Sequence, residues 1–498
     1  MRIHTLLLSL LMTAISFTSN AQFCGYDSDA AETARLLRNK KAYKTNGPQR
    51  SVVDIYIPIT FHIVSETNGT GGIDEDRVIA QLCALNEDYN PHGIYFYLKD
   101  KTFNYVKSTI LFSSPSAQSA GTKMITEKIN NGKNSVNIFI CENADTGGTS
   151  GGTTLGYYDP FLDAIVIRKQ DVNAFTGTLS HELGHFFSLD HTFNGWDSEA
   201  YDPAVHGNPV SSMFSPGGVQ NELADGSNCE NAGDFLCDTP ADYNLGLGWP
   251  GCTPYTGGAK DFNGEELDPD EENFMGYFIG CDEYHFSDLQ IEMVIADYQS
   301  NDRDFLNSVS YVPSLNLNLE NTTLVAPANA ATVETYNYVK LEWTQVSGAD
   351  GYIVEVTQGI TNSIYISPNP YLHITDLEAD KTYRWKVLPY SEVGGCASFT
   401  TERIVKTGNI LASSELSQIG ISLYPTVIEG GSEVIIESSG SYDGNVSIFD
   451  VQGKLLNNFE LNLQSGLNRI YDTPSQAGLY FVSVETLGQQ QTFKLVVQ

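Results

Sequence analysis

The stretch "SHELGHFFSLDHTF", residues 180–193, constrains this chain more than any other. His181 and His185 stand four apart, and Glu182 follows the first of them. On a helix, residues four apart share one face, so both imidazoles can bind one ion while Glu182 reaches a water on that ion. His191 can supply a third ligand after a turn, and three protein ligands plus a water are typical of catalytic zinc. We therefore expect a helix, a sharp turn and a zinc site here.

The alternative is that these histidines only pack in a core, or that the pattern is accidental. At this chain's histidine frequency, HExxH arises by chance in roughly one chain in a hundred. A suitably placed His191 lowers that chance roughly fifty-fold. The metal interpretation is therefore favoured from the residues alone.

Composition excludes some partners. The chain has 498 residues, enough for about three domains. Hydrophobic residues make up 41% and charged residues 18%, which is typical of globular proteins. The formal net charge of −34 opposes binding to nucleic acid and to anionic membranes.

The N-terminus is typical of an exported protein. Arg2 precedes an apolar run from Leu6 to Phe17, and small residues follow, which predicts a signal peptide over residues 1–21. No later stretch is apolar for long enough to span a bilayer. We expect the mature protein to be secreted, extracellular or at the cell surface, where disulfides can form.

Residues 22–50 are polar and mostly helix-prone, and they end at a basic cleavage site, Arg50-Ser51. We interpret them as a pro-segment. Residues 51–312 mix strands and helices and are expected to form an α+β domain. Predicted strands are "DIYIPITFHIV", "NSVNIFIC" and "DAIVIRK"; predicted helices are residues 75–88 and "NAFTGTLSHELGHFF".

Two all-β sandwich domains are expected after that. In residues 320–408, Trp343, Tyr383 and Trp385 suit a sandwich core, and the segment resembles a fibronectin type III domain. A generic sandwich is the alternative and gives the same fold class. Residues 420–498 contain further short strands, and they resemble the C-terminal sorting domains of Bacteroidetes type IX secretion substrates. The matching pieces are Tyr424-Pro425, Asp450 to Gly453, Ala477 to Tyr480 and Lys494 to Val497.

The histidine segment resembles the metzincin zinc peptidases, whose pattern is HExxHxxGxxH followed by a Met-turn. "NFMGY", residues 273–277, matches that turn through Met275. Within the metzincins the resemblance is to the pappalysins. It rests on "HTF" after the third histidine, "GDFLCDTPA" at 233–241, a Gly-Cys at 251–252 and a cysteine after the Met-turn. The resemblance covers residues 51–300.

The resemblance implies a metzincin-like catalytic domain and a secreted zinc endopeptidase acting on proteins or peptides. Glu182 would be the general base, and Tyr277 would stabilise the tetrahedral intermediate. A buried core tyrosine is the alternative for Tyr277. Met275 would form an apolar floor beneath the metal. The type IX secretion machinery would be a further partner.

One residue departs from the pattern. Ser188 stands where the family has a glycine at the turn after the helix, where we expect positive φ and about 1 kcal/mol of strain. The rival function is therefore a catalytically weak or inactive, peptidase-like cell-surface binding protein. Glu182 favours the enzyme, because a binding module has no need of it.

Calcium is a second expectation from the resemblance. Asp234, Asp238 and Thr239 offer oxygen ligands, and Cys237 would contribute its carbonyl. A solvated acidic loop is the alternative.

Disulfide connectivity cannot be read from sequence. By resemblance Cys252 pairs with Cys281, which would leave Cys229 for Cys237.

Cys24 lies in the expected pro-segment, before Gly25. A thiolate binds zinc well, so Cys24 could displace the catalytic water and keep a zymogen silent, as in similar pappalysin relatives. The alternatives are that Cys24 forms a disulfide or begins the mature chain.

The cleavage preference is a separate question. Relatives that prefer basic residues carry an acidic residue between the Met-turn tyrosine and the next cysteine. Between Tyr277 and Cys281 this chain has none, so a basic preference is not indicated.

Overall fold

The structure is a computed structural model. The residues that it describes are 22–24, 30–46, 54–116, 120–129, 134–144, 153–307, 310–317, 319, 322–410, 421–438, 440–464, 466–471, 473–486 and 489–498. They fall into two compact units, one within Met1–Val333 and Val339–Gly408, the other within Glu334–Tyr338 and Asn409–Gln498. The predicted signal peptide lies outside the described residues.

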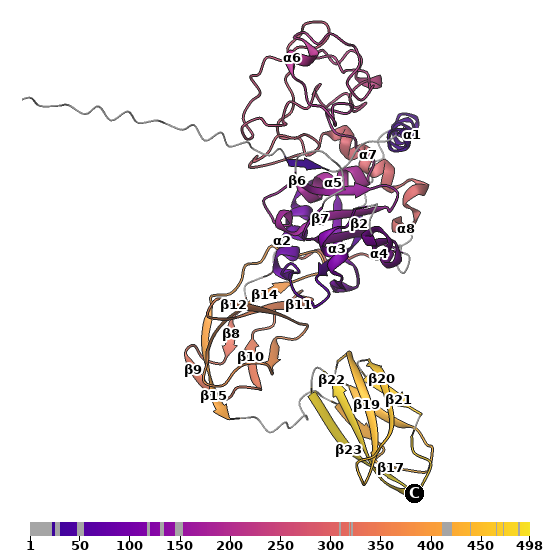
Figure 1. The fold of residues 1–498 in the computed structure, drawn as a ribbon, viewed down its shortest axis with the longest axis vertical. Helices are drawn as coiled ribbons and strands as arrows, with labels where there is room; N and C mark the ends of the chain where they lie inside the picture. Colours follow the sequence, from indigo (N-terminus) through magenta and orange to yellow (C-terminus); the bar gives the residue numbers. More distant parts are fainter. Residues whose placement is uncertain are drawn as a thin grey trace, which may run out of the picture. The chain divides into compact units, whose positions relative to one another are not determined.

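A mixed seven-stranded sheet lies at the centre of the first described unit (Figure 1). Its strands are β1 (Gln22–Cys24), β2 (Ile55–Ser65), β3 (Ile94–Leu98), β4 (Asn104–Lys107), β5 (Val136–Cys141), β6 (Thr153–Asp159) and β7 (Ala164–Arg168). Their order is β1-β6-β7-β5-β2-β3, and β4 also pairs with β2. Strand β6 runs antiparallel to β7, and the other pairs are parallel. Strands of a parallel sheet are covered on both faces, and accordingly every residue of β5 is buried.

Helices pack on both faces of this sheet. The described helices of this unit are α1 (Ala30–Asn46), α2 (Glu75–Tyr89), α3 (Thr109–Ser113), α4 (Ala120–Ile129), α5 (Thr178–Phe186), α6 (Pro203–His206), α7 (Asp288–Tyr298) and α8 (Asp304–Asn307), with 3-10 turns at Asn90–His92, Lys99–Lys101, Lys169–Asp171, Cys229–Asn231 and Asn301–Arg303. Of these, the short helix α6 lies in the loop region between Phe193 and Cys281. Side chains alternate along a strand, so Ile138 and Ile140 of β5 share a core with α1, α2, α5 and α7. Phe139 and Cys141 face the core with α3 and α4.

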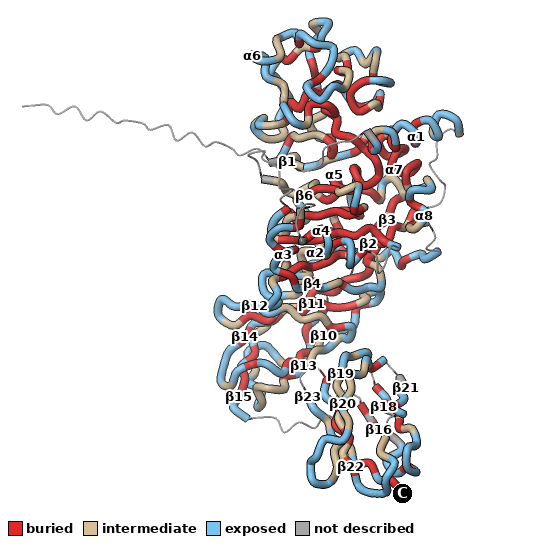
Figure 2. Tube along the Cα trace, turned by 45° about the vertical axis from the view of Figure 1, so that its right-hand side comes forward, coloured by how far each residue is buried: buried red, intermediate tan, exposed pale blue. Residues whose placement is uncertain are grey.

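Turns and loops predominate between Phe193 and Cys281, around a small core of their own. In that core the rings of Trp196 and Tyr243 stack 5.0 Å apart. Disulfides join Cys229 to Cys237 and Cys252 to Cys281, so both expected pairings are confirmed. The buried stretches of the first unit run through the sheet and α5 (Figure 2).

A β-sandwich follows in the same unit. Its strands are β8 (Leu324–Ala326), β9 (Ala331–Thr335), β10 (Val339–Trp343), β11 (Gly351–Gln358), β12 (Thr361–Ser367), β13 (Tyr371–Ile374), β14 (Thr382–Tyr390) and β15 (Arg403–Ile410). They form sheets of order β13-β10-β8 and β12-β11-β14-β15-β9. Trp343, Tyr383 and Trp385 are buried between them, as expected.

Residues of β11 and β14 belong to the main core of the α/β part, and a loop after β14 adds covalent and hydrogen-bond contacts to it. A disulfide joins Cys83 of α2 to Cys396. Beside it, the Asn86 side-chain amide donates to Val393 O at 3.1 Å, and Leu98 N donates to Glu392 O at 2.6 Å. This loop is therefore built into the α/β part.

The second unit is a separate sandwich with its own core. Its strands are β16 (Ile421–Tyr424), β17 (Val427–Ile428), β18 (Val434–Ser438), β19 (Tyr442–Asp450), β20 (Leu455–Leu463), β21 (Gly466–Ile470), β22 (Gly478–Thr486) and β23 (Gln489–Val497). Their sheet orders are β16-β18-β21 and β17-β23-β22-β19-β20.

The predicted fold class, an α+β part followed by two β-sandwiches, is confirmed. Strands β2, β5 and β7 lie where the sequence placed them, while the helix expected from Asn173 begins only at Thr178. The reason is local: the Asn173 side chain accepts a hydrogen bond from Phe175 N at 2.9 Å, which forms a turn instead of helix. No helix among the described residues is long and apolar enough to cross a membrane. The exact domain boundaries stay predictions.

Candidate metal centre and active site

Helix α5 carries the first two histidines. Leu179, Leu183 and Phe186 are wholly buried in the main core and fix the helix on the sheet. The opposite side of the helix presents His181 and His185 to the site, as their spacing predicts. Both imidazoles are thereby held on a rigid, buried element.

Ser188 turns the chain after α5. Its φ is 71°, so the expected left-handed conformation is confirmed. Ser188 N donates to His185 O and Leu189 N donates to Gly184 O, both at 2.9 Å, which ends the helix. The Ser188 hydroxyl, 2% exposed, accepts a hydrogen bond of 2.9 Å from the Asn39 amide of α1. This turn leads the chain back so that His191 faces the helix.

The three imidazoles converge. The Nε2 atoms lie 3.1 Å apart for His181 and His185, 3.1 Å for His185 and His191, and 3.2 Å for His181 and His191. Nitrogens bound to one tetrahedral zinc at 2.0–2.1 Å would be about 3.3 Å apart. The spacing fits a single shared ion.

The partners of the other ring nitrogens support the same conclusion. His181 Nδ1 lies 2.6 Å from Phe274 O, and His185 Nδ1 lies 2.8 Å from Leu189 O. A carbonyl only accepts, so each Nδ1 carries the proton and each Nε2 is a bare lone pair. Burial lowers the pKa of His181 to about 3 and that of His185 well below its usual value, so both rings are neutral. Imidazole lone pairs that face one another in this way are suited to binding one shared cation.

His191 is oriented by a carboxylate: its Nδ1 lies 2.5 Å from Asp197 Oδ1. The second oxygen of Asp197 accepts from Gly195 N at 2.8 Å, so the carboxylate is itself held in place. Such a partner fixes the ring and makes the other nitrogen a stronger ligand.

Met275 is wholly buried and packs against Gly184, between the two histidines of α5. A Cβ on Gly184 would stand 2.5 Å from the Met275 sulfur, so only glycine allows this close approach. Met275 N donates to the Asn273 side chain at 2.9 Å, and Met275 O accepts from Thr192 at 3.2 Å. The turn at Met275 thus supports the segment that carries His191.

Glu182 lies beside this centre and is wholly buried. Its Oε1 has no hydrogen-bond partner, and its Oε2 accepts from the Cys24 thiol at 3.5 Å. Burial raises the pKa of the Glu182 carboxyl to about 8. A desolvated carboxyl with an oxygen still to be satisfied is suited to proton transfer.

Cys24 and Tyr277 lie on the open side of the site. Cys24 Sγ and the three imidazoles offer ligand atoms that all lie within 4.8 Å of one another. Cys24 N donates to the Tyr277 hydroxyl at 3.0 Å, and burial raises the pKa of Tyr277 well above its usual value. Strand β1 brings Cys24 here by pairing with β6, where Cys24 lies opposite Gly156.

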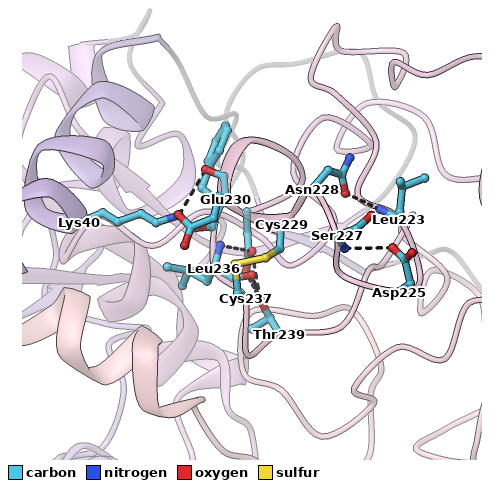
Figure 3. The surroundings of a disulfide bond; sticks show 12 residues. Lys40, Leu223, Asp225, Ser227, Asn228, Cys229, Glu230, Leu236, Cys237 and Thr239 are labelled. Carbon is cyan, nitrogen blue, oxygen red and sulfur yellow. Dashed lines mark hydrogen bonds and ion pairs between the residues drawn. A yellow bond between two sulfur atoms is a disulfide. The ribbon is translucent and has the colours of Figure 1, made fainter. Parts of the chain in front are cut away.

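The calcium prediction gains no support. The Thr239 hydroxyl lies 3.0 and 2.9 Å from the two carboxylate oxygens of Asp234 and donates its one proton between them, and Leu236 N donates to Asp234 Oδ1 at 2.9 Å. Asp238 instead caps α7, accepting from Ser287 and Leu289. Cys237 forms a disulfide with Cys229, shown in Figure 3 with Thr239 close by. These contacts give Asp234 and Asp238 structural partners.

Sequence reasoning missed the residues that orient the histidines. Asp197 follows His191 by six positions, a spacing without a known pattern. The carbonyls of Phe274 and Leu189 carry no side-chain signal. Arg35, on α1, donates to Phe186 O at 2.7 Å and so holds the end of α5 from a distant part of the chain.

Several known proteins are similar to parts of this chain. Residues 423–498 match the secretion system C-terminal sorting domain. An extracellular metalloprotease of Sordaria macrospora is 24% identical over 283 residues, which cover 51% of this chain and 80% of that protein. One of Neurospora crassa is 24% identical over 280 residues, with the same coverage of 51% and 80%. Among solved structures, a Tannerella forsythia promirolysin mutant is 18% identical, with a TM-score of 0.38, covering 58% of this chain and 100% of that chain.

The buried imidazole cluster and the relatives define the class of this protein as a metallopeptidase. It carries a sorting domain for a secretion system and is secreted or lies at the cell surface. The predictions of a secreted metallopeptidase and of a C-terminal sorting domain agree with these findings.

Proposed function

We propose that the protein is a zinc-dependent endopeptidase of the metzincin type. The observation that carries the proposal is the convergence of three Nε2 atoms, 3.1 to 3.2 Å apart, beside the unpartnered Oε1 of Glu182. His181, His185 and His191 would hold the ion. The chemistry that zinc supplies when bound is a water of near-neutral pKa and polarisation of the scissile carbonyl.

Glu182 performs the proton transfers. Its carboxylate takes a proton from the attacking water and passes it to the leaving amine. The raised pKa of its carboxyl, caused by burial, brings it nearer to neutral pH, where such a group can both accept and donate. The Tyr277 hydroxyl, which now accepts from Cys24 N, is placed to donate to the oxyanion of the tetrahedral intermediate.

A polypeptide substrate is supported by the sheet edge. Strand β6 is the edge strand once β1 is set aside, and β1 shows that an extended chain can pair with it close to Glu182. Extended peptides are commonly bound in this way, by main-chain hydrogen bonds to a strand. We propose that substrates replace β1, and that the type IX secretion machinery reads the sorting domain.

We propose that Cys24 keeps the uncut precursor inactive as a peptidase. Its thiol lies within reach of the three imidazoles and of Glu182, where it would occupy the position of the attacking water. Cutting at Arg50-Ser51 would allow it to leave. This assignment also accounts for a cysteine that the structure describes outside any disulfide.

The second candidate is an inactive binding protein, which Ser188 would favour. The strain at its positive φ is about 1 kcal/mol. That is small beside the stability of a domain, about 5–15 kcal/mol, and the three Nε2 atoms still converge. The observed turn therefore favours the enzyme.

The test compares the zinc-loaded chain, cut after Arg50, with its Glu182→Ala variant. The parent should cleave casein, and a zinc chelator should stop it. Glu182→Ala should keep one equivalent of zinc and the same fold but lose cleavage by several orders of magnitude. A variant that cuts as well as the parent would show that Glu182 is not the base. A parent that binds zinc and cuts nothing would support the binding protein.

A further inference from the structure

A cavity of about 280 Å³ opens beside the metal centre. His181 and Glu182 form one wall, and another is formed by Phe274, residues 276–280 and Tyr284. Its volume is close to the lower end for ligand pockets, about 300 Å³, which suits one large side chain. Because the reacting groups line it, its occupant would flank the scissile bond.

The lining of this cavity is apolar and nearly without charge. The apolar side chains are those of Leu155, Phe175, Phe274, Phe278 and Ile279. Among the described residues that line it, Glu182 is the one carboxyl group. Asp282 and Glu283 are exposed and lie outside the lining. A lysine or arginine side chain would lose its water here and find no carboxylate other than the catalytic base.

Two exposed apolar side chains form the rim. Phe175 is 91% exposed and Ile279 is 48% exposed, although both line the cavity. Exposed large apolar groups beside a cleft are typical of a contact surface for a ligand.

Neither rim residue is on a loose loop. The Asn173 side chain accepts from Phe175 N at 2.9 Å, and Thr176 donates to Asp171 O at 2.6 Å. On the other side, the Tyr284 hydroxyl donates to Phe278 O at 3.2 Å, and the Cys252–Cys281 disulfide fixes the end of the segment. The rim is therefore preformed.

The absence of a side chain at Gly177 allows two aromatic rings to pack closely against the start of α5. A Cβ added there would lie 3.0 Å from the Phe274 ring and 3.5 Å from that of Tyr284. The aromatic wall therefore approaches the start of α5 as closely as a glycine allows. The cavity is bounded by rings on this side, which favours an apolar occupant again.

We propose that this cavity selects substrates with a large apolar residue, such as Leu, Met, Phe or Tyr, at one of the two positions that flank the scissile bond. The inference rests on the proposed function and adds a substrate class to it. Apolar pockets select among side chains by about 10- to 200-fold. We therefore expect at least tenfold enrichment of apolar over basic residues at that position.

The first experiment profiles cleavage of a proteome-derived peptide library. The enzyme is the zinc-loaded protein after cleavage at Arg50-Ser51. Enrichment of apolar residues on one side of the cut supports the inference and identifies the side. Enrichment of Lys or Arg, or equal use of all residues, overturns it while leaving the peptidase in place.

Variants then locate the preference. Ile279→Asp should shift the ratio of kcat/KM for matched basic and apolar peptides at least tenfold towards the basic one. Ile279→Asn, of the same shape without the charge, should weaken the apolar preference and create no basic one. Phe161→Asp adds the same charge at a position that is 91% exposed and outside the cavity, so it should leave the ratio unchanged. A shift of equal size in Phe161→Asp would contradict the assignment.

A binding measurement separates this inference from the proposed function. In Glu182→Gln, fluorescence anisotropy with matched Leu and Lys peptides reports occupancy of the cavity without cleavage. Tenfold tighter binding of the Leu peptide supports the cavity's preference, and equal or reversed affinities overturn it. If the parent cuts nothing, the proposed function fails, and this binding series still decides the preference.

Discussion

The two described pieces of the N-terminal segment contact α5 from different sides, and they do so with different chemistry. Strand β1 adds three residues to the sheet edge and brings Cys24 to Glu182 and Tyr277. Helix α1 packs on α7 and holds the C-terminal end of α5. One piece touches the reacting groups, while the other supports the element that carries them.

Arg35 is the main contact of α1. It is 7% exposed, its Nε lies 3.1 Å from Asp297, and it donates to Phe186 O at 2.7 Å. Arg303 binds the other oxygen of Asp297 and also contacts Phe186 O, so two guanidinium groups enclose this helix end. Cations at a helix C-terminus are favourable, and buried ion pairs cost much when one partner is removed.

On the other edge of α1, Lys40 is 7% exposed and pairs with Glu230 at 2.9 Å (Figure 3). It also donates to Phe235 O. Leu36, wholly buried, belongs to the main core. The comparison teaches that a segment expected to be removed as a whole contains one short strand beside Glu182 and one buried helix that supports the core.

The largest effect is expected at Arg35. Arg35→Ala should destabilise the α/β part by about 3 kcal/mol, because Asp297 keeps Arg303 but two helix-end carbonyls lose a buried donor. For a domain of this size the melting temperature should fall by about 6–12 °C, measured by calorimetry on the uncut chain.

Arg38→Ala is the matched control. Arg38 lies on the same helix and pairs with Asp302 at 2.8 Å, but its side chain is 61% exposed. Exposed pairs contribute about 0–1 kcal/mol, so this variant should melt close to the parent. Equal losses for Arg35→Ala and Arg38→Ala would remove the structural role assigned to α1.

A smaller effect on stability and a clear effect on activity are expected at Cys24. Cys24→Ala should leave the uncut chain at least tenfold more active than the parent, or able to cut itself, because the thiol no longer lies beside Glu182. The melting temperature should change by less than the equivalent of about 1 kcal/mol, since β1 is only three residues long.

Cys141→Ala controls for loss of a thiol. Cys141 is the other cysteine described outside the disulfides, buried in the core against α3 and α4. That uncut variant should stay as inactive as the parent. A Cys24→Ala precursor that also stays inactive would assign any inhibition to the rest of the segment, and the contrast between β1 and α1 would disappear.

The smallest effect is expected at the turn where α1 and α5 meet. Ser188→Gly relieves about 1 kcal/mol of strain and loses the hydrogen bond from Asn39, worth about 0.5–1.5 kcal/mol. Stability should therefore change by less than about 1 kcal/mol, and activity should be equal or higher. In Asn39→Ala, the Ser188→Gly change should become more stabilising, which denaturant titration of the double variant would measure.

The sequence predicted the parts of this site that depend on local spacing. His181 and His185 follow helical geometry, and the positive φ of Ser188 followed from the resemblance, which has a glycine at that position. Pairing of Cys252 with Cys281 followed from the resemblance. Each of these depends on residues that are near in the chain or belong to a known pattern.

The contacts of Arg35, Asn39 and Asp197 could not be predicted in the same way. Arg35 and Asn39 lie about 150 positions from the residues they contact on α5 and the turn after it. A helix-prone polar stretch such as α1 does not indicate which of its charges will be buried. The insertion of the Cys396 loop against α2 was missed for the same reason, because no local pattern connects Cys83 with a residue in a later sandwich.

That disulfide has a consequence for the durability of an exported peptidase. Cys83 and Cys396 are 313 positions apart in the chain. A nick made anywhere between them, by a neighbouring copy or by another enzyme, leaves both fragments covalently joined. Such damage would be invisible on a non-reducing gel and would appear as two bands after reduction. The Cys83–Cys396 disulfide thus keeps the two fragments together after a single peptide-bond cleavage, the reaction that this protein is itself proposed to catalyse.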